Sequence, residues 1–385
     1  TEDASELRIP LQNIYIFNKV INEVPSALNG TDAEKNSLIA EAKAMRAWTY
    51  FLLINYYGKP YNAATAASDA GFPIVTDAEV TETNFTRASV QEVYDFILSD
   101  LTTSIPSLPP RVTHRIKMSK AAAEGLLGKV YVFMGRFNDA LPMLNASIND
   151  ISGASIPVGL YDYNVTLATG GSFLPISIFG PTYPTVVNNQ ENIFGKQVSN
   201  PYAFIGNELV ITPQTVALYG SNDLRLQFYS ATPYGGPDYP NGLRRRTAPG
   251  AIQFGVVLPD IYLLRAECKV RSNDLSGAVT DLQTLRARRM PAGSAAVPAA
   301  TASQQISLLR YVMDERIREF ALQGFRWYDM RRLSVDPLFS GTVYTHTQYS
   351  ATGGVSNTYT LTPERLVLRL PQKIIDQNPG MVNNP

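Results

Sequence analysis

The sequence predicts a mainly α-helical protein in which a scaffold of helical hairpins carries a large, loop-rich insertion with short β-strands. Three observations lead to this fold class. Apolar residues recur at steps of three and four through the first 150 residues, which is the spacing of one helix face. A helix–turn–helix spacing near residue 130 is echoed near residue 270. Between these two stretches, residues 151–256 lose the helical spacing and hold thirteen of the 26 glycines and ten of the 26 prolines.

The first 60 residues predict two helices. The first is marked by apolar residues from Ile14 to Val24, and the second begins after Thr31. Thr31 and Glu34 have the spacing of a capping box, which satisfies two free backbone donors at a helix start. Gly58 is typical of a helix end, so the second helix should fill most of 32–57.

A third helix is predicted to follow the loop 59–87. Ser89 and Glu92 form another capping box, and Pro106 sets the end because its ring cannot continue a helix. These three helices would form the start of the scaffold.

The next hairpin has the spacing of a tetratricopeptide repeat, carried by Leu127, Gly128, Tyr131, Gly135, Phe137 and Ala140. Small residues at 128 and 140 would let two antiparallel helices approach closely, with Tyr131 filling the groove and Gly135 breaking the chain. A weaker echo keeps the spacing at Ala266, Asn273, Leu275 and Ala278. Such hairpins must stack on neighbours, so we expect the helices of 9–57 and 302–333 to complete the stack.

These patterns divide the chain into three parts of one compact unit. Residues 1–150 form the N-terminal scaffold, residues 151–256 the irregular insertion and candidate ligand face, and residues 257–385 the C-terminal scaffold and tail. Within the insertion, 172–179 and 208–212 could be short strands. Thr/Tyr/Val alternation around 342–346 predicts a hairpin within 340–370.

Composition excludes several function classes. The 33 basic and 33 acidic residues cancel, so no overall field attracts nucleic acid, and no nucleotide motif occurs. The single Cys268 rules out an internal disulfide framework. Two histidines, His114 and His346, are too few for an ordinary zinc site, so we expect neither metal nor cofactor. No stretch of about 18 apolar residues occurs.

The candidate catalytic carboxylates are explained more simply by ion pairing. Asp314, Glu315 and Glu319 fall on a predicted helix 303–322, where Arg318 is at surface-pairing distance from the first two. Asp329 could pair with Arg326 or Arg331. No nucleophile elbow is present, so we predict no catalytic residues, and a glycosidase using Asp329 or Glu319 is the least favoured hypothesis.

Tyrosines in the insertion are the remaining functional signal. The candidate ligand-binding residues beside proline or glycine are Tyr183, Tyr202, Tyr234 and Tyr239. A tyrosine ring joins an apolar face to a polar handle, which suits flat, neutral, hydroxylated ligands such as sugars. Arg244 is a candidate donor to hydroxyls, although Arg244, Arg245 and Arg246 together predict a solvated loop with one ion pair. Three such contacts between a tyrosine ring and a sugar would give a binding free energy of roughly 4 kcal/mol, or a Kd near ~1 mM.

Several segments carry a resemblance to a known family. They are residues 40–51 (Ala-Glu-Ala-Lys-Ala-Met-Arg-Ala-Trp-Thr-Tyr-Phe), 55–60 (Asn-Tyr-Tyr-Gly-Lys-Pro), 119–136, 315–332 and 369–380 (Arg-Leu-Pro-Gln-Lys-Ile-Ile-Asp-Gln-Asn-Pro-Gly). In order and spacing the chain resembles the SusD/RagB family of nutrient-binding outer-membrane lipoproteins from about residue 10 to 385. Nothing in 151–256 matches.

This resemblance implies a tetratricopeptide-type scaffold, a lipid anchor on the extracellular face of the outer membrane of Bacteroides-like bacteria, and docking on a TonB-dependent transporter of the SusC type. It implies glycan binding without catalysis, although RagB-like relatives handle peptides. Family chains usually begin with a lipidated cysteine, which this chain lacks, so we expect that the anchor was removed. The alternative hypothesis is a helical-repeat module that binds a peptide or protein.

Overall fold

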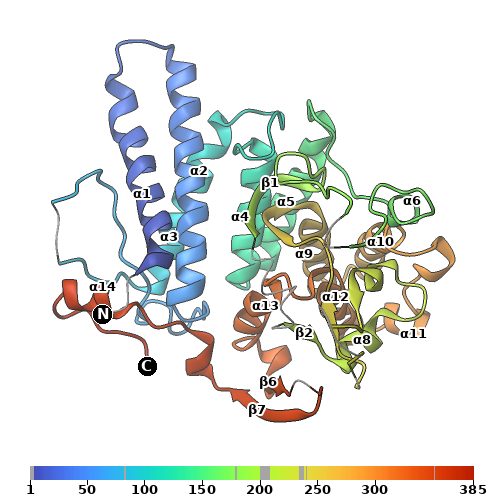
Figure 1. The fold of residues 1–385 in the computed structure, drawn as a ribbon. Coiled ribbons are helices and arrows are strands. Elements are labelled where there is room, and N and C mark those ends of the chain that lie inside the picture. The colour runs from blue at the N-terminus through green and yellow to red at the C-terminus, as the bar shows by residue number, and fades with distance from the viewer. Residues whose placement is uncertain are drawn as a thin grey trace.

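The computed structural model describes residues 4–81, 84–177, 180–199, 209–233, 238–239, 241–350 and 352–385. Helices form the body of the molecule, and the insertion lies over one end of it (Figure 1). The antiparallel helices α1 and α2 stand at the other end. After the last scaffold helices the chain runs back along the base of the molecule, so that its C-terminal residues end near its N-terminal ones.

The helices account for most of the regular structure. The longer ones are α1 (Ser5–Glu23), α2 (Asp32–Tyr57), α3 (Val90–Ser104), α4 (Lys120–Phe133), α5 (Phe137–Asp150), α9 (Leu258–Arg271), α10 (Leu275–Arg286), α12 (Gln305–Phe320) and α13 (Phe325–Leu333). The shorter ones are α6 (Tyr163–Thr166), α8 (Pro213–Tyr219), α11 (Ala299–Ala302) and α14 (Gln372–Gln377). Short 3-10 turns include η4 (Leu224–Phe228), which belongs to the insertion.

The strands are short and antiparallel. They are β1 (Asn192–Ser199), β2 (Val210–Ile211), β3 (Tyr229–Ser230), β4 (Arg244–Arg246), β5 (Ala251–Val257), β6 (Tyr344–Tyr349) and β7 (Val355–Leu361). β1 pairs with β5 as a two-stranded ribbon, β4 lies between β2 and β3, and β6 pairs with β7.

Both predicted capping boxes are present. The Thr31 hydroxyl accepts from the Glu34 backbone N–H, and the Glu34 carboxylate accepts from the Thr31 N–H at 2.8 Å, so α2 begins where the sequence indicates. Ser89 and Glu92 do the same at the start of α3. Gly58 follows the last residue of α2, as predicted.

The predicted tetratricopeptide hairpin is α4–α5. A Cβ added to Gly128 would lie 2.7 Å from the Leu144 side chain, so only glycine allows this approach of the two helices. Ala140 is fully buried at the same contact, and Gly135 has a φ of 71° in the turn. The second hairpin, α9–α10, turns at Asn273, which takes the same left-handed conformation at φ 64°.

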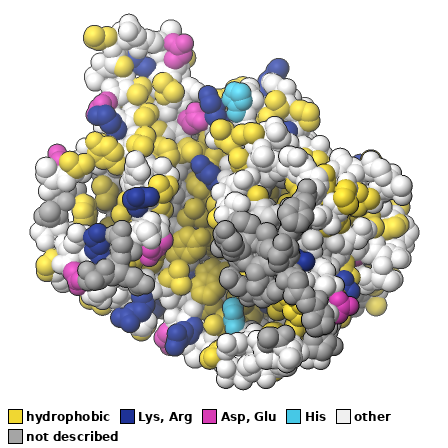
Figure 2. Space-filling model, in the orientation of Figure 1, with side chains coloured by type: hydrophobic (Ala, Val, Ile, Leu, Met, Phe, Trp, Pro, Cys, Tyr) yellow, Lys and Arg dark blue, Asp and Glu magenta, His cyan; other side chains and the backbone are white. Residues whose placement is uncertain are grey.

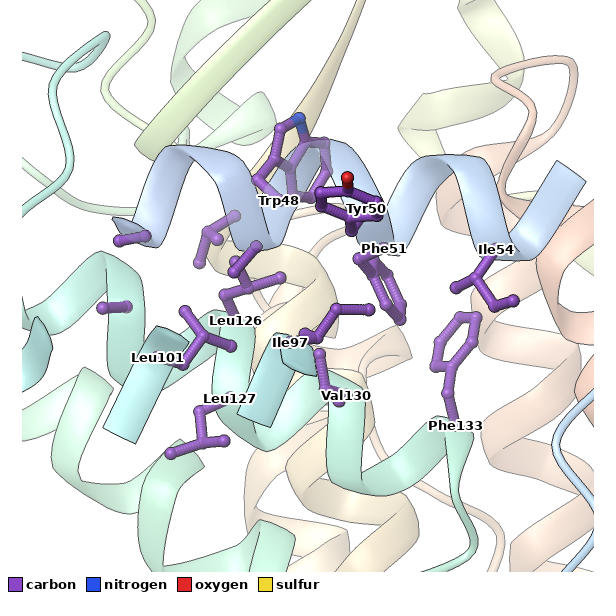
Figure 3. Close-up of a cluster of buried hydrophobic side chains, with 14 of the residues drawn as sticks. Trp48, Tyr50, Phe51, Ile54, Ile97, Leu101, Leu126, Leu127, Val130 and Phe133 are labelled. Carbon is purple, nitrogen blue, oxygen red and sulfur yellow. The ribbon is translucent and has the colours of Figure 1, made fainter. Parts of the chain in front are cut away.

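The largest core lies between α2, α3 and α4 (Figure 3). Phe51 points from α2 toward α3 and α4, and its ring centroid lies 5.0 Å from that of Phe133. Trp48 points to the other side of α2, where it meets Phe194 of β1 and Phe254 of β5 at 6.0 and 6.2 Å. Both rings are buried, and Trp48 ties the β1–β5 ribbon to the helical body.

The strand predictions were only partly right. The β6–β7 hairpin is confirmed, and 208–212 contains the two-residue β2. In the described part of 172–179 there is no strand, only an isolated bridge from Ser177 to Gly180, because this segment turns back on itself after Gly170 and Gly171. The β1–β5 ribbon, the longest strand pair in the described part of the insertion, was not predicted.

None of the helices within the described ranges is both long and apolar enough to cross a bilayer.

Candidate functional site

A buried ion-pair network joins the insertion to helix α12. Glu315 has no exposed surface, and its carboxylate is 2.6 Å from Arg225 of η4, 2.6 Å from Arg286 of α10 and 2.7 Å from Arg318. The prediction of surface pairing on this helix was therefore wrong for Glu315. The local pair with Arg318 exists, but the insertion covers it and adds Arg225 as a partner, and α10 adds Arg286.

The network continues from Glu315 to Glu319 and Glu191. Glu319 lies 2.8 Å from Arg225 and 2.7 Å from Arg289, and Arg289 also lies 2.7 Å from Glu191. Glu319 is also buried, so surface pairing was wrong for it too. Four basic and four acidic side chains make up the network, and their charges cancel: Arg225, Arg286, Arg289 and Arg318 with Asp223, Glu191, Glu315 and Glu319.

Asp329 belongs to a separate buried group of charges. It pairs with Arg316 at 2.8 Å and with Arg332 at 2.9 Å, so the predicted partners Arg326 and Arg331 were wrong. The Arg331 side chain instead donates to the backbone carbonyl of Gly58 at 2.6 Å. Burial acts to raise the pKa of Asp329, but the two guanidinium groups outweigh it and lower the pKa to about 2.

A pocket of about 110 Å³ opens beside the Glu319 end of the network, and we call it the insert pocket. Its walls come from loops of the insertion, from β1 and β5, and from the end of α12. The insertion therefore contributes most of the pocket, and the scaffold supplies its charged base.

One wall of the insert pocket is aromatic. The Phe173 ring lies at the centre, 5.2 Å from the Tyr161 ring and 5.5 Å from the Tyr183 ring, with Phe228 at 6.4 Å. Tyr183 is half-buried, and its hydroxyl donates to the Phe173 carbonyl at 3.3 Å. Burial raises the pKa of Tyr183 to about 12, so this hydroxyl stays protonated at neutral pH.

Polar groups with unused hydrogen-bonding capacity line the same pocket. Asn192 is fully buried, and its amide nitrogen donates to Gln253 at 2.6 Å and to Val186 at 3.1 Å. Its Oδ1 has no hydrogen-bond partner in the described part of the chain.

Glu191 accepts through Oε1 from the Tyr161 N–H and from Arg289, and no described residue donates to its Oε2. Burial, followed by repulsion from Glu319, raises the pKa of Glu191.

The basic cluster at 244–246 is not the solvated loop that we predicted. It is the central strand β4, Arg245 and Arg246 are buried, and none of the three forms an ion pair with a described residue. The reason is that the guanidinium groups donate to carbonyls and a hydroxyl of the insertion. Arg246, which lines the insert pocket, donates to the Pro249 carbonyl at 3.1 Å and to the Tyr229 hydroxyl at 3.4 Å.

The predicted ligand-binding residues are placed as follows. Tyr183 lines the insert pocket. Tyr202 and Tyr234 lie outside the described residues. Tyr239 is half-buried, and its backbone N–H donates to the Ala231 carbonyl. Arg244 donates to the Tyr229 carbonyl at 3.4 Å. Neither Tyr239 nor Arg244 lines the insert pocket.

Asn192, Gln253 and Arg246 were missed as pocket residues. Their places depend on the β1–β5 ribbon and on β4, which the sequence did not predict.

A second, apolar groove of about 320 Å³ lies between α2, the β1–β5 ribbon and the loop before α13. Figure 2 shows hydrophobic side chains gathered down the middle of this face, between the α1–α2 hairpin and the lobe with the insertion. Trp48, Leu52, Phe254 and Tyr328 line it, and the Tyr328 hydroxyl donates to that of Tyr56 at 2.9 Å.

No group of three or more histidine, cysteine, aspartate or glutamate side chains in the described ranges is arranged to hold a metal ion.

The fold and the pocket define a class of protein with a tetratricopeptide-like helical scaffold and a pocket built largely by an insertion. Two family models match the chain: one described as starch-binding and associating with the outer membrane, over residues 8–132, and one described as the SusD family, over residues 258–385. The chain belongs to the SusD/RagB family, as its sequence motifs predicted. Neither of these models extends into 133–257, where most of the insert pocket lies.

Individual relatives agree with this assignment. A SusD-like protein of Bacteroides ovatus is 29% identical over 130 residues, which is 33% of this chain but only 21% of the relative's length. A putative sugar binding protein of Bacteroides vulgatus is 22% identical with a TM-score of 0.72, over 100% of this chain and 86% of that one. A SusD superfamily protein of Bacteroides thetaiotaomicron is 20% identical with a TM-score of 0.73, over 98% and 84%. The predicted fold class is thereby confirmed.

Proposed function

We propose that this protein captures oligosaccharide or polysaccharide at the bacterial surface and passes it to a TonB-dependent, SusC-like transporter without cleaving it. The family model that describes starch binding and association with the outer membrane supports the glycan and the location. Two Bacteroides vulgatus proteins of similar structure, one named a putative sugar binding protein and the other a SusD-like carbohydrate binding protein, also support it. In this proposal a lipid anchor holds the protein on the extracellular face of the outer membrane.

The observation that carries the proposal is the composition of the insert pocket. An aromatic ring such as Tyr183 offers an apolar face to the C–H groups of a sugar ring. The open acceptors Asn192 Oδ1 and Glu191 Oε2 are available to sugar hydroxyls. Asn192 Oδ1 is buried and unpaired, and filling it removes a desolvation cost of about 1–3 kcal/mol. A pocket with apolar walls and a few polar groups is the usual form of a small-molecule site.

The carboxylates favour binding over catalysis. A glycosidase needs one protonated and one ionised carboxyl group on either side of the bond that breaks. Asp329 and Glu319 both have lowered pKa values, because arginines outweigh the effect of burial, and both are ionised. Product release from an oligosaccharide that Asp329→Asn abolishes would contradict this part of the proposal.

Binding should be weak at a single pocket. One aromatic contact of about 0.5–1.5 kcal/mol and two or three hydrogen bonds of about 1 kcal/mol each give roughly 4 kcal/mol, or a Kd near ~1 mM. Polysaccharides offer repeated sugar units to many anchored copies, so capture on the cell would depend on avidity.

Affinity electrophoresis and calorimetry against a polysaccharide panel test the glycan proposal. Wild-type protein should bind at least one glycan, Tyr183→Ala should weaken this binding about tenfold, and Tyr183→Phe, which keeps the ring, should retain most of it. Failure of the wild type to bind any glycan would overturn the proposal. Hand-over to a transporter is tested separately, by co-purification of a TonB-dependent transporter from native outer membranes.

A peptide is the second candidate ligand, and the apolar groove favours it. Leu52, Phe254 and Trp48 could accept apolar side chains of an extended peptide, whereas the groove offers few polar groups to a sugar. Leu52→Asp should abolish binding to a peptide library if the groove is the site. If Leu52→Asp leaves peptide binding unchanged, or if no peptide binds, this alternative fails.

A further inference from the structure

Among the described charged side chains that line the insert pocket, Arg246 is the one without an ion pair. The arginines and carboxylates of the buried network cancel, four against four. Arg246 also lines the pocket and is 5% exposed, but no carboxylate in the described part of the chain pairs with it. The insert pocket therefore carries one positive charge that the surrounding residues do not neutralise.

The guanidinium group of Arg246 also has N–H donors for which no described residue is an acceptor. Its Nε donates to the Pro249 carbonyl and its Nη1 to the Tyr229 hydroxyl, while no described residue accepts from Nη2. Burying a charge without a partner is costly. An arginine fork matches the geometry of carboxylate or sulfate oxygens and binds them more strongly than neutral acceptors.

We propose that the insert pocket selects a sugar residue that carries an acidic group, a carboxylate or a sulfate, and that Arg246 binds this group. The inference rests on the proposed function, because it names the class of glycan for the same pocket. Asn192 and Glu191 accept from hydroxyls of the sugar residue, and Tyr183 lies against its ring. Arg289 and the rest of the network balance the charge of Glu191, so that this carboxylate does not cancel the attraction of Arg246.

The size of the pocket restricts the acidic group to one sugar residue. A volume of about 110 Å³ is far below the 300–1,000 Å³ of sites that enclose drug-sized ligands. One acidic residue of a longer glycan would therefore enter, and the neighbouring residues would remain outside. Selection by a single charge also predicts that binding weakens as salt rises, because ions screen the attraction.

Matched pairs of glycans test the inference. The panel contains acidic polysaccharides, each in its native form and in a neutral form with carboxyl groups reduced to alcohols or sulfates removed. We expect a native acidic glycan to bind wild-type protein about tenfold more tightly than its neutral form, which corresponds to ~1.4 kcal/mol. The carboxyl-reduced and desulfated pairs distinguish the two sources of the acidic group.

Variants assign the effect to Arg246. Arg246→Gln should remove the tenfold preference while keeping the weaker binding to the neutral form. Arg310→Gln changes the net charge equally, on an exposed part of α12 with no ion pair to a described residue, and should leave the preference unchanged. Thermal melting shows whether Arg246→Gln folds. If it does not fold, the salt dependence of wild-type binding is the test. Loss at high salt of the preference for the native acidic glycan over its neutral form supports the inference. A preference unaffected by salt overturns it.

The remaining outcomes separate this inference from the proposed function. If native and neutral forms bind equally, or if Arg246→Gln keeps the preference, the acidic-sugar inference is overturned and glycan binding stands. If no glycan of either form binds, the proposed function itself fails.

Discussion

Arg225 of the insertion and Glu315 of helix α12 form an ion pair with 2.6 Å between Nη2 and Oε1, although 90 positions separate them in the chain. Both side chains are buried, and each has further charged partners. This contact holds the irregular insertion on the helical scaffold. The shape of the insert pocket therefore depends on a network of charges as well as on apolar packing.

Removing Arg225 should destabilise the whole protein. Arg225→Met leaves Glu315, Glu319 and Asp223 short of one positive charge in a buried environment, and such losses cost about 3–5 kcal/mol. Urea denaturation followed by circular dichroism measures the loss. The control Arg310→Met, at an exposed position of helix α12, should change the free energy of unfolding by less than ~0.5 kcal/mol. Equal stability of the two variants would show that the network does not hold the insertion.

The α4–α5 contact makes a second prediction, at Gly128. Gly128→Ala places a methyl group 2.7 Å from Leu144, so the helices must move apart. Overpacking of this kind costs about 1–3 kcal/mol, which exceeds the ~1 kcal/mol that alanine contributes to a helix over glycine. Gly128→Ala should therefore melt at a lower temperature than the wild type. Gly153→Ala, whose added Cβ meets no atom within 4 Å, is the control and should melt with the wild type.

Low pH should reduce the stability of the folded protein, partly because Asp329 becomes protonated. Its pKa is about 2 in the folded state, against an ordinary value of 3.8, so the folded state favours the ionised form. The resulting stability, on the order of 2 kcal/mol, is fully present above pH ~4 and is lost as pH falls toward 2. The difference in unfolding free energy between wild type and Asp329→Asn should therefore shrink across this range. A difference that stays constant from pH 5 to pH 2 would contradict the assignment.

Glu124 should respond to pH in the opposite direction. Burial, together with the nearby Asp150 carboxylate, raises the pKa of Glu124 to about 7, and its Oε2 is buried without a partner in the described residues. The folded state therefore holds this proton more tightly than the unfolded chain does. Stability from Glu124 is present below pH 4.5 and is lost as pH rises toward 7. The stability of Glu124→Gln relative to wild type should thus rise from pH 4.5 to 7, as measured by urea titrations.

The helical scaffold was predictable because its signals are local. A capping box such as Thr31 with Glu34 lies within four residues, and the small residues that allow the α4–α5 approach fall at fixed spacings. These features act before any distant part of the chain is considered. The β6–β7 hairpin was found for the same reason, since its alternating residues are close in sequence.

The insert pocket was not predictable in the same way. Asn192 and Gln253 meet because β1 pairs with β5 across about 60 residues, and no turn signal links these strands. Glu315 and Arg318 have the spacing of a surface pair, and only the covering insertion makes them a buried network. Tyr183 was found through its neighbouring proline. The residues that give the pocket its charge and acceptors come from contacts that a local pattern does not encode.

The most direct measurement is a crystal structure of the protein with an oligosaccharide from the glycan that binds in the affinity panel. We predict density for one sugar residue in the insert pocket, with its ring against Tyr183 and its hydroxyls within hydrogen-bonding distance of Asn192. An oligosaccharide bound elsewhere on the molecule, with the insert pocket left unoccupied at saturating ligand, would contradict it.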